Sequence, residues 1–410
     1  MARIRQKSNK LITSIDIGSS KVCCIIAEIT GDVPKIIGIG HHGISGIKQG
    51  VSPNMETIEN AILNAVHKAE KGANLTVKNA IINISGKHLL SEIMSVTTDI
   101  KGHAVGETDI RKLLMQGTNT NPGKDFSILH ANPIRFSIDK GQSVTNPRGM
   151  YGNTLTGHLH IVTGALNPTR NIVNCLRRCH IDVRGIVPSA IASGFSTLVE
   201  DEIDLGVILV DMGSHHTNVA IFMDGEVVHT DSIPLGGVNI TNDLAQGLAT
   251  SLSAAERIKI LHGSAIETTE DSRVMVEIPS LDGQQTPVHV RRSLVTSIVK
   301  PRVEEILEMI RRRLEKSDVY KMTSRRVVLT GGTSQLPGLR ELTQKILHKQ
   351  ARLGKPLDAF KSRDPYSFPS FATCTGLLTF ALRQNYSEQE PRGVKKSWVT
   401  PLIKWFKDNF

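Results

Sequence analysis

Two short segments, 195 residues apart, repeat one pattern: an apolar strand ends in an aspartate and a glycine turn, and a second apolar strand follows. Residues 16–21 read Asp-Ile-Gly-Ser-Ser-Lys, and residues 211–217 read Asp-Met-Gly-Ser-His-His-Thr. One such turn alone is usually a structural hairpin. Two copies at matching places indicate an internal duplication and therefore two similar α/β halves.

The two hairpins also indicate a ligand. A glycine hairpin directs several backbone N–H groups into one concavity, which suits phosphate oxygens. The leading residues Asp16 and Asp211 can hold a hydrated Mg²⁺ beside such phosphates. Two hairpins that face each other would bind a nucleotide from both sides, so the sequence predicts a nucleotide site between the halves.

Composition limits the class of protein. A chain of 410 residues, 39% hydrophobic and 21% charged, is long enough for two to four compact units. It has no apolar run near the roughly 18 residues of a membrane-spanning helix. The basic N-terminus leads into a strand and not into a signal-peptide core, so we expect a cytoplasmic location. The net charge is +10, but only 4% of residues are aromatic, and we expect no nucleic-acid partner.

The first half alternates predicted strands with predicted helices, which is typical of a sheet covered by helices. Residues 86–164 differ in texture and predict a small α+β insert. Helices are expected at 55–71, at 168–178 with Asn167 as N-cap, and at 189–199. Strands are expected at residues 12–16, 22–28, 36–39 and 80–84, and within the insert at 91–98, 128–138 and 158–162.

The second half restarts with a strand at 207–210. A helix is expected from residue 239, and another at 253–261 with Ser253 as N-cap. A β-rich patch (274–278 and 287–290) and a long helix broken near Pro301 follow. The strand at 327–330 then leads through Gly331 and Gly332 to a helix at 338–348, an arrangement that also suits a phosphate or a nucleoside.

Taken together, these motifs resemble the bacterial FtsA cell-division family of the actin, Hsp70 and sugar kinase superfamily, over essentially the whole chain. Residues 16–21 resemble the phosphate-1 hairpin, 211–217 the phosphate-2 hairpin, and 329–333 the adenosine loop. Residues 187–193 and 371–378 resemble the two connecting helices, and Ser85-Gly86-Lys87-His88 is particularly FtsA-like. The resemblance implies a two-lobed actin-like (ribonuclease H-like) fold with duplicated mixed sheets.

The resemblance also implies a division into domains. Residues 1–85, 165–200 and 365–383 would form lobe 1, or 1A, and residues 86–164 the inserted 1C domain. Residues 201–243 and 300–364 would form lobe 2, or 2A, with residues 244–299 as its subdomain 2B. Residues 384–397 read as a flexible linker, and residues 398–410 as an amphipathic helix.

The expected ligands are ATP and Mg²⁺, with Asp16 and Asp211 holding the metal through water. By resemblance, Glu256 and Lys259 would contact the adenosine ribose and base. No catalytic residue is expected. The full set of expected nucleotide-binding residues is Gly18, Ser19, Ser20, Lys21, Gly213, Ser214, His215, His216, Thr217, Gly236, Gly237, Glu256, Lys259, Gly331, Gly332 and Thr333.

The phosphate-2 segment departs from the family pattern. Ser214, His215 and His216 replace the second glycine, the third glycine and the next residue, and only Gly213 remains. These side chains would crowd the terminal phosphates, and any residue there with φ > 0 would cost about 1 kcal/mol or more. We therefore expect weak hydrolysis at most. One hypothesis is that the imidazoles donate hydrogen bonds to phosphate; the other is that the site no longer needs ATP.

The C-terminal residues 398–410 carry an independent signal. Both tryptophans of the chain lie here, and five basic residues against Asp408 give residues 392–410 a net charge of +4. At 3.6 residues per turn the large apolar side chains share one face, which predicts a helix lying on an anionic membrane surface and not docked on the core. The expected membrane residues are Trp398, Val399, Leu402, Ile403, Trp405, Phe406 and Phe410.

The resemblance implies an ATP-binding scaffold that polymerises head to tail and tethers the FtsZ ring to the cytoplasmic face of the inner membrane at the septum. The C-terminal peptide of FtsZ would contact Arg302 and Glu305, and the 1C insert would face the next protomer and later division proteins. The alternatives are a sugar kinase or phosphatase of the same fold and a pilus-assembly actin-like protein.

Overall fold

A computed structural model describes residues 10–30, 33–44, 54–120, 122–280, 287–317, 319–320, 326–357 and 367–383. Its first half is built on a five-stranded mixed sheet in the order β3-β2-β1-β4-β8. The first three strands are antiparallel, whereas β4 and β8 run parallel to β1. The strands are β1 (Lys10–Ile17), β2 (Lys21–Thr30), β3 (Val33–Gly43), β4 (Asn79–Ile84) and β8 (Asp182–Pro188).

The second half repeats this sheet strand for strand, in the order β11-β10-β9-β14-β15. Antiparallel pairing again joins the first three strands, and parallel pairing joins the last two. The predicted duplication is therefore confirmed. The strands are β9 (Val207–Met212), β10 (Thr217–Met223), β11 (Glu226–Ile233), β14 (Arg326–Thr330) and β15 (Gln350–Leu353).

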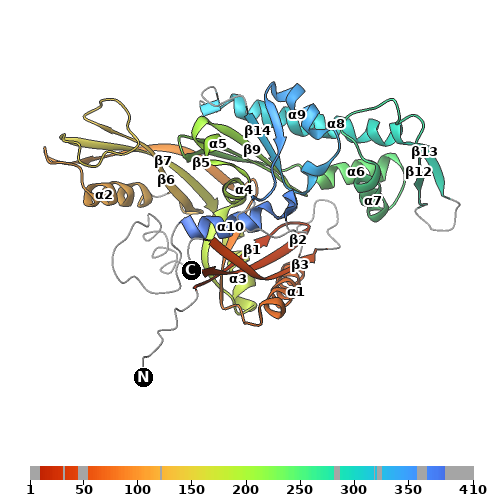
Figure 1. The fold of residues 1–410 in the computed structure, drawn as a ribbon, viewed down its shortest axis with the longest axis horizontal. Helices are drawn as coiled ribbons and strands as arrows, with labels where there is room; N and C mark the ends of the chain where they lie inside the picture. Colours follow the sequence, from red (N-terminus) through yellow and green to blue (C-terminus); the bar gives the residue numbers. More distant parts are fainter. Residues whose placement is uncertain are drawn as a thin grey trace.

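Helices cover both sheets (Figure 1). On the first half these are α1 (Met55–Ala73), α3 (Leu166–Arg178), α4 (Ser189–Thr197) and α10 (Ala372–Arg383). On the second half they are α5 (Glu200–Leu205), α8 (Arg292–Glu315) and α9 (Leu339–Leu347). The helices α6 (Gly237–Gly247) and α7 (Leu252–His262) lie to the side of this sheet, toward the hairpin of residues 275–291. Short 3₁₀ turns lie at Gly332–Gln335 and Pro369–Phe371.

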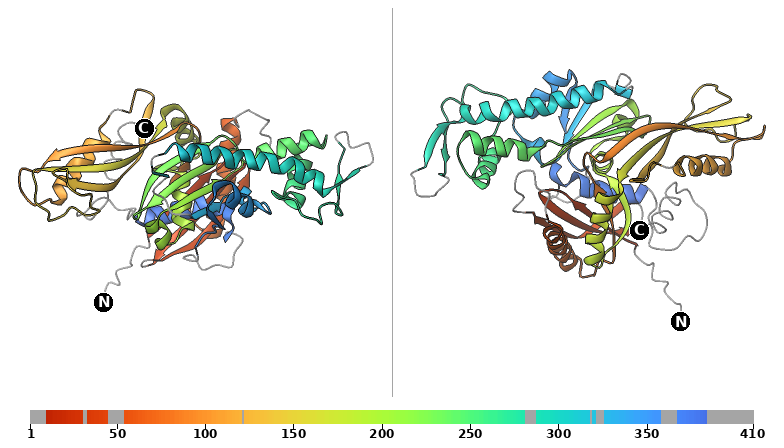
Figure 2. Two further views of the ribbon diagram at one scale, coloured as in Figure 1. Left: turned by 90° about the horizontal axis from the view of Figure 1, so that it is seen from above. Right: turned by 180° about the vertical axis from the view of Figure 1, so that it is seen from behind.

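Two smaller units lie at opposite ends of the molecule (Figures 1 and 2). The insert has a three-stranded antiparallel sheet in the order β5-β7-β6, with its own buried cluster beneath α2. Its elements are β5 (Leu89–Asp99), α2 (Glu107–Thr118), β6 (Phe126–Ile138) and β7 (Thr154–Ala165). The hairpin of β12 (Met275–Ile278) and β13 (Val288–Arg291) lies at the far end.

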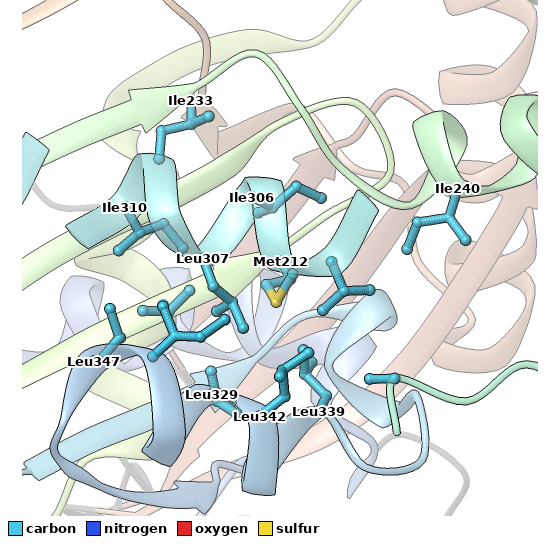
Figure 3. Close-up of a cluster of buried hydrophobic side chains, with 14 of the residues drawn as sticks. Met212, Ile233, Ile240, Ile306, Leu307, Ile310, Leu329, Leu339, Leu342 and Leu347 are labelled. Atoms are coloured by element: carbon cyan, nitrogen blue, oxygen red, sulfur yellow. The ribbon is translucent and has the colours of Figure 1, made fainter. Parts of the chain in front are cut away.

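The second half has a core of aliphatic side chains between its sheet and the helices α8 and α9 (Figure 3). Ile306, Leu307 and Ile310 of α8 pack there with Leu329 of β14 and Leu342 of α9. These residues recur at helical and strand spacing, so their apolar faces are buried together.

A second buried cluster joins the two halves. It contains Ile12 and Ile25 of the first sheet, Leu209 and Phe222 of the second sheet, and Leu377 of α10. The helices α4 and α10 lie in the middle of this cluster. A Cβ on Gly376 of α10 would lie 1.7 Å from the carbonyl oxygen of Ala192 on α4, so only glycine permits this approach. The halves therefore share one core.

Three local predictions are wrong. The N-cap of α3 is Ala165 and not Asn167, and the N-cap of α7 is Ser251, whose Oγ accepts a hydrogen bond from the backbone N–H of Ala254, and not Ser253. The helix α8 continues through Pro301. A proline removes one helical hydrogen bond, but the buried apolar face of α8 keeps the helix continuous.

None of the helices in the described part of the chain combines the length and the apolar character needed to cross a bilayer. The predicted linker at 384–397 and the predicted membrane-surface residues at 398–410 lie outside the described residues.

Candidate functional site

The two hairpins have the same backbone geometry. The N–H of Gly18 donates to the carbonyl oxygen of Lys21 at 3.0 Å, and the N–H of Gly213 donates to that of His216 at 2.9 Å. Their flanking strands pair in the same register, with Ile17 opposite Val22 and Met212 opposite Thr217. The repeat seen in the sequence is therefore a repeat of two turns closed by the same hydrogen bond.

The side chains that replace glycines in the second hairpin cause no backbone strain. Ser214, His215 and His216 are absent from the described non-glycine residues that have φ > 0. The cost that left-handed backbone would carry therefore does not arise at these three positions. The turn closes through backbone atoms of Gly213 and His216, which do not depend on the side chains between them.

Asp16 and Asp211, the leading residues of the hairpins, are both buried. Burial raises the pKa of Asp16 to about 7, Lys21 opposes this change, and the neighbouring Asp211 adds to it. Burial also raises the pKa of Asp211, against the hydrogen bonds from Ser193 (2.6 Å) and Thr373 (3.3 Å). Two buried carboxylates that repel each other form a site that favours a cation.

Lys21 is the basic side chain that acts on both carboxylates. Its ammonium lies over the ring of Phe371, with Nζ 3.7 Å from the ring centroid, while His41 packs edge-on against the same ring. A cation–π contact of this kind holds the lysine near the hairpin without neutralising it. Lys21 therefore remains available for an anion.

A third loop meets the second hairpin. Gly331 has φ +86°, and a Cβ there would lie 2.4 Å from Oδ1 of Asp211, so only glycine fits. The Thr333 hydroxyl donates to the carbonyl oxygen of Gly213 at 2.9 Å. The N–H of Gly237 donates to the same oxygen at 3.0 Å. The loops at 213–216, 236–237 and 331–333 are therefore joined.

Glu256 and Lys259 lie on α7 beside this joined set of loops. The Lys259 ammonium donates to the carbonyl oxygen of Gly237 at 3.1 Å, to the Thr241 hydroxyl at 2.9 Å and to Oε2 of Glu256 at 2.7 Å. The pair is therefore not an ordinary exposed pair on a surface helix. The structure thus brings the predicted residues of α7 and those of the glycine loops together.

Other residues at the site were not predicted. Ser193 on α4 and Thr373 on α10 share Oδ2 of Asp211, and their hydroxyls lie 2.9 Å apart. The Asn83 amide oxygen accepts the N–H of Ile17 at 2.7 Å and so fixes the end of β1. Only the resemblance of the two connecting helices to the family pointed toward this region.

Arg302 and Glu305 lie on α8, apart from the hairpins. The Arg302 guanidinium forms two hydrogen bonds to Asp243 of α6, at 2.6 and 2.9 Å, and also pairs with Glu305. The Glu305 side chain is about half exposed. Arg302 thus joins α6 to α8, whereas Glu305 offers its carboxylate to solvent.

Comparison with known proteins identifies the chain. A family model described as cell division protein FtsA matches residues 208–376, and one described as the SHS2 domain inserted in FtsA matches residues 86–163. The cell division protein FtsA of Agrobacterium fabrum is 38% identical over 427 residues, covering 99% of this chain and 96% of that protein. The chain belongs to the FtsA family. The FtsA proteins of Pseudomonas aeruginosa (33% identical; 98% of this chain and 99% of that protein) and Escherichia coli K12 (28%; 99% and 100%) also match.

Solved structures agree with an FtsA-type, actin-like fold. A structure described as the PilM-PilN type IV pilus biogenesis complex matches with a TM-score of 0.62 at 14% identity, covering 90% of this chain and 98% of that one. MreB5 of Spiroplasma citri bound to ADP matches with a TM-score of 0.54 at 12% identity, covering 93% and 99%. The predicted resemblance to FtsA and the predicted fold class are both confirmed.

Proposed function

We propose that the site binds ATP between the two halves of this FtsA-family protein. The observation that carries this proposal is the meeting of matched hairpins, the Gly331 loop and the Glu256–Lys259 pair around two buried aspartates. Residues 18–21 and 213–217 would contact phosphates, and Glu256 with Lys259 would contact the nucleoside. The structure of MreB5, which shares this fold, was solved with ADP, and this supports nucleotide binding by a protein of this fold.

The aspartates fit a Mg²⁺ ion held through water. Asp16 and Asp211 are both buried, and the pKa of each is raised, so each carboxylate gains from a nearby cation. Bound Mg²⁺ would neutralise phosphate charge, while Ser193 and Thr373 orient Asp211.

We further propose that nucleotide binding serves assembly more than turnover. The side chains of Ser214, His215 and His216 fill the second hairpin, and no residue is assigned a catalytic role. The FtsA relationship supports a division protein over the sugar kinase or phosphatase alternative. It also outweighs the likeness to PilM, which concerns the fold alone.

The division role would be that of a membrane-tethered scaffold. The protein would polymerise head to tail and hold the FtsZ ring, through the FtsZ C-terminal peptide, at the cytoplasmic face of the inner membrane. The insert would face the next protomer and later division proteins. The domain boundaries given in the sequence analysis are part of this proposal, with 1C at residues 86–164 and 2B at residues 244–299.

Membrane attachment would come from residues 398–410. Each large apolar side chain that enters the interface contributes about 1.5–3 kcal/mol, and each basic residue about 1 kcal/mol at an anionic leaflet. Ordering a short helix costs a comparable amount. One copy would therefore bind reversibly, and a polymer would bind far more firmly through its many copies.

Deletion of residues 398–410 tests the anchor. We expect the full chain to pellet with vesicles that contain anionic lipid and to bring polymerised FtsZ with it. The truncated protein should keep the thermal unfolding midpoint of the full chain and stay in the supernatant. If the truncated protein still pellets with the vesicles, the anchor lies elsewhere.

Glu305→Lys tests the FtsZ contact in the same assay. Glu305 is the better probe than Arg302, because it is exposed and its loss leaves the Arg302–Asp243 pair between α6 and α8 in place. Charge reversal should weaken FtsZ recruitment by roughly tenfold and leave vesicle binding unchanged. The matched control is Glu304→Lys, one residue away on the same helix, which should recruit FtsZ normally. Equal recruitment by both variants would place the contact on another surface.

A further inference from the structure

The segment that connects the first sheet to the insert lies at the second hairpin. Residues 85–88 follow β4, and β5 of the insert begins directly after them. A Cβ placed on Gly86 would lie 3.8 Å from Nε2 of His216. His88 also closes the root of the insert, because its carbonyl oxygen accepts the N–H of Ala165 at the end of β7.

Three imidazoles gather at this point. His88 acts electrostatically on His216, and His215 is its neighbour in the chain. Nε2 of His88 and Nδ1 of His215 are shielded from solvent and have no hydrogen-bond partner among the described residues. A buried ring nitrogen without a partner is costly, so these nitrogens are poised for a ligand that can accept or donate hydrogen bonds.

The side chains around His216 suit an anion. The titratable groups that act on His216 within the described chain are His215 of its own loop and His88 and Lys87 of the β4–β5 segment. All three are basic side chains. Burial lowers the pKa of each of the three histidines and so favours their neutral forms.

We propose that His216 and His88, assisted by Lys87 and His215, form a subsite for the terminal phosphate of a nucleoside triphosphate. This inference rests on the proposed nucleotide site and adds to it the root of the insert. The second hairpin, in lobe 2, and residues 87–88, at the root of the insert, both contact this phosphate. The insert thereby distinguishes a triphosphate from a diphosphate.

Proton uptake follows from the same chemistry. A neutral imidazole has one N–H donor, whereas a protonated imidazole has two and carries a charge. An anion beside the histidines stabilises the protonated form and raises a pKa that burial had lowered. ATP binding therefore takes up protons, and the affinity for ATP rises as the pH falls from 8 to 6.5.

The test is isothermal titration of the full chain with Mg·ATP and with Mg·ADP at pH 6.5 and 8, in buffers of different ionisation enthalpy. The wild type should bind ATP more tightly than ADP, by roughly tenfold at pH 6.5, with net proton uptake. H88Q should bring the ATP to ADP ratio close to one while leaving the ADP affinity unchanged. H216Q, which alters the phosphate-binding hairpin itself, should also bring this ratio close to one. K87Q, at an exposed position that does not threaten the fold, should lower the ratio as well.

The control is H289Q, on the exposed hairpin strand β13, which should behave as wild type at both pH values. The phosphates of ATP also change their protonation between pH 6.5 and 8. This contribution is the same for every variant and cancels when the variants are compared. If H216Q and H88Q keep the wild-type ratio of ATP affinity to ADP affinity and the wild-type proton uptake, the subsite is wrong. The proposal that the protein binds a nucleotide would then still stand. Absence of binding by both nucleotides at both pH values would overturn both.

Discussion

Replacing Gly376 by alanine should lower the free energy of unfolding by about 2–4 kcal/mol, because the new methyl group has no space. Its carbon would lie 1.7 Å from the carbonyl oxygen of Ala192 and 2.4 Å from the carbonyl carbon. Both are backbone atoms of α4, so no side-chain rotation relieves the overlap. The helices α4 and α10 would have to separate within the core that joins the two halves.

Gly72→Ala is the matched control for this change. Gly72 also lies in a helix, α1, but a Cβ there would meet its nearest atom at 3.5 Å, an ordinary contact. Alanine should therefore stabilise the protein by up to about 1 kcal/mol through helix propensity alone. Chemical denaturation of both variants measures the difference. If Gly376→Ala is as stable as the wild type, the close packing of α4 and α10 is not as described.

Asp16→Asn should stabilise the protein above pH 7 in the absence of Mg²⁺ and nucleotide, by on the order of 4 kcal/mol. The pKa of Asp16 is raised from its ordinary 3.8 to about 7 in the folded state. Between these values the folded protein binds more protons than the unfolded chain, so the contribution of Asp16 to stability falls as the pH rises. Asparagine does not ionise, and its advantage should therefore vanish below about pH 4.

The same substitution should have the opposite effect once ligand is present. Mg·ATP should raise the unfolding midpoint of the wild type and raise that of Asp16→Asn much less, because the carboxylate that would hold the hydrated metal is gone. Asp125→Asn, at an exposed position of the insert, serves as control and should show neither effect. Wild-type ligand stabilisation in Asp16→Asn would remove Asp16 from the metal site.

The sequence was sufficient to predict the central strands of both sheets and the main glycine loops because these signals are local. The edge strands β8 and β15 were not predicted. Alternation, strand length and the position of Gly331 after an apolar strand each depend on a few neighbouring residues. The contacts of the Ser193 and Thr373 hydroxyls with Asp211 could not be predicted in this way. They reach Asp211 across 18 and 162 positions of chain, and only the packed helices α4 and α10 bring them there.

The wrong predictions have a common physical cause, which is that tertiary packing and backbone hydrogen bonds overrode a local preference. Pro301 should interrupt a helix, but the buried face of α8 holds it continuous. Asn167 and Ser253 are good N-caps by residue type, but the N-caps of α3 and α7 are Ala165 and Ser251. The contacts of His88 were likewise invisible, because the hairpin it meets is more than a hundred positions away.

The position of α10 has a consequence for synthesis on the ribosome. This helix is formed by residues 372–383, yet it packs against β1, β2 and β4 of the first sheet. The strands of the first sheet are synthesised long before α10. The apolar face that α10 covers therefore stays exposed until nearly the whole chain has left the ribosome. Translation that stops before residue 372 therefore leaves an incomplete first half, which is a substrate for chaperones and proteases and not a smaller working protein.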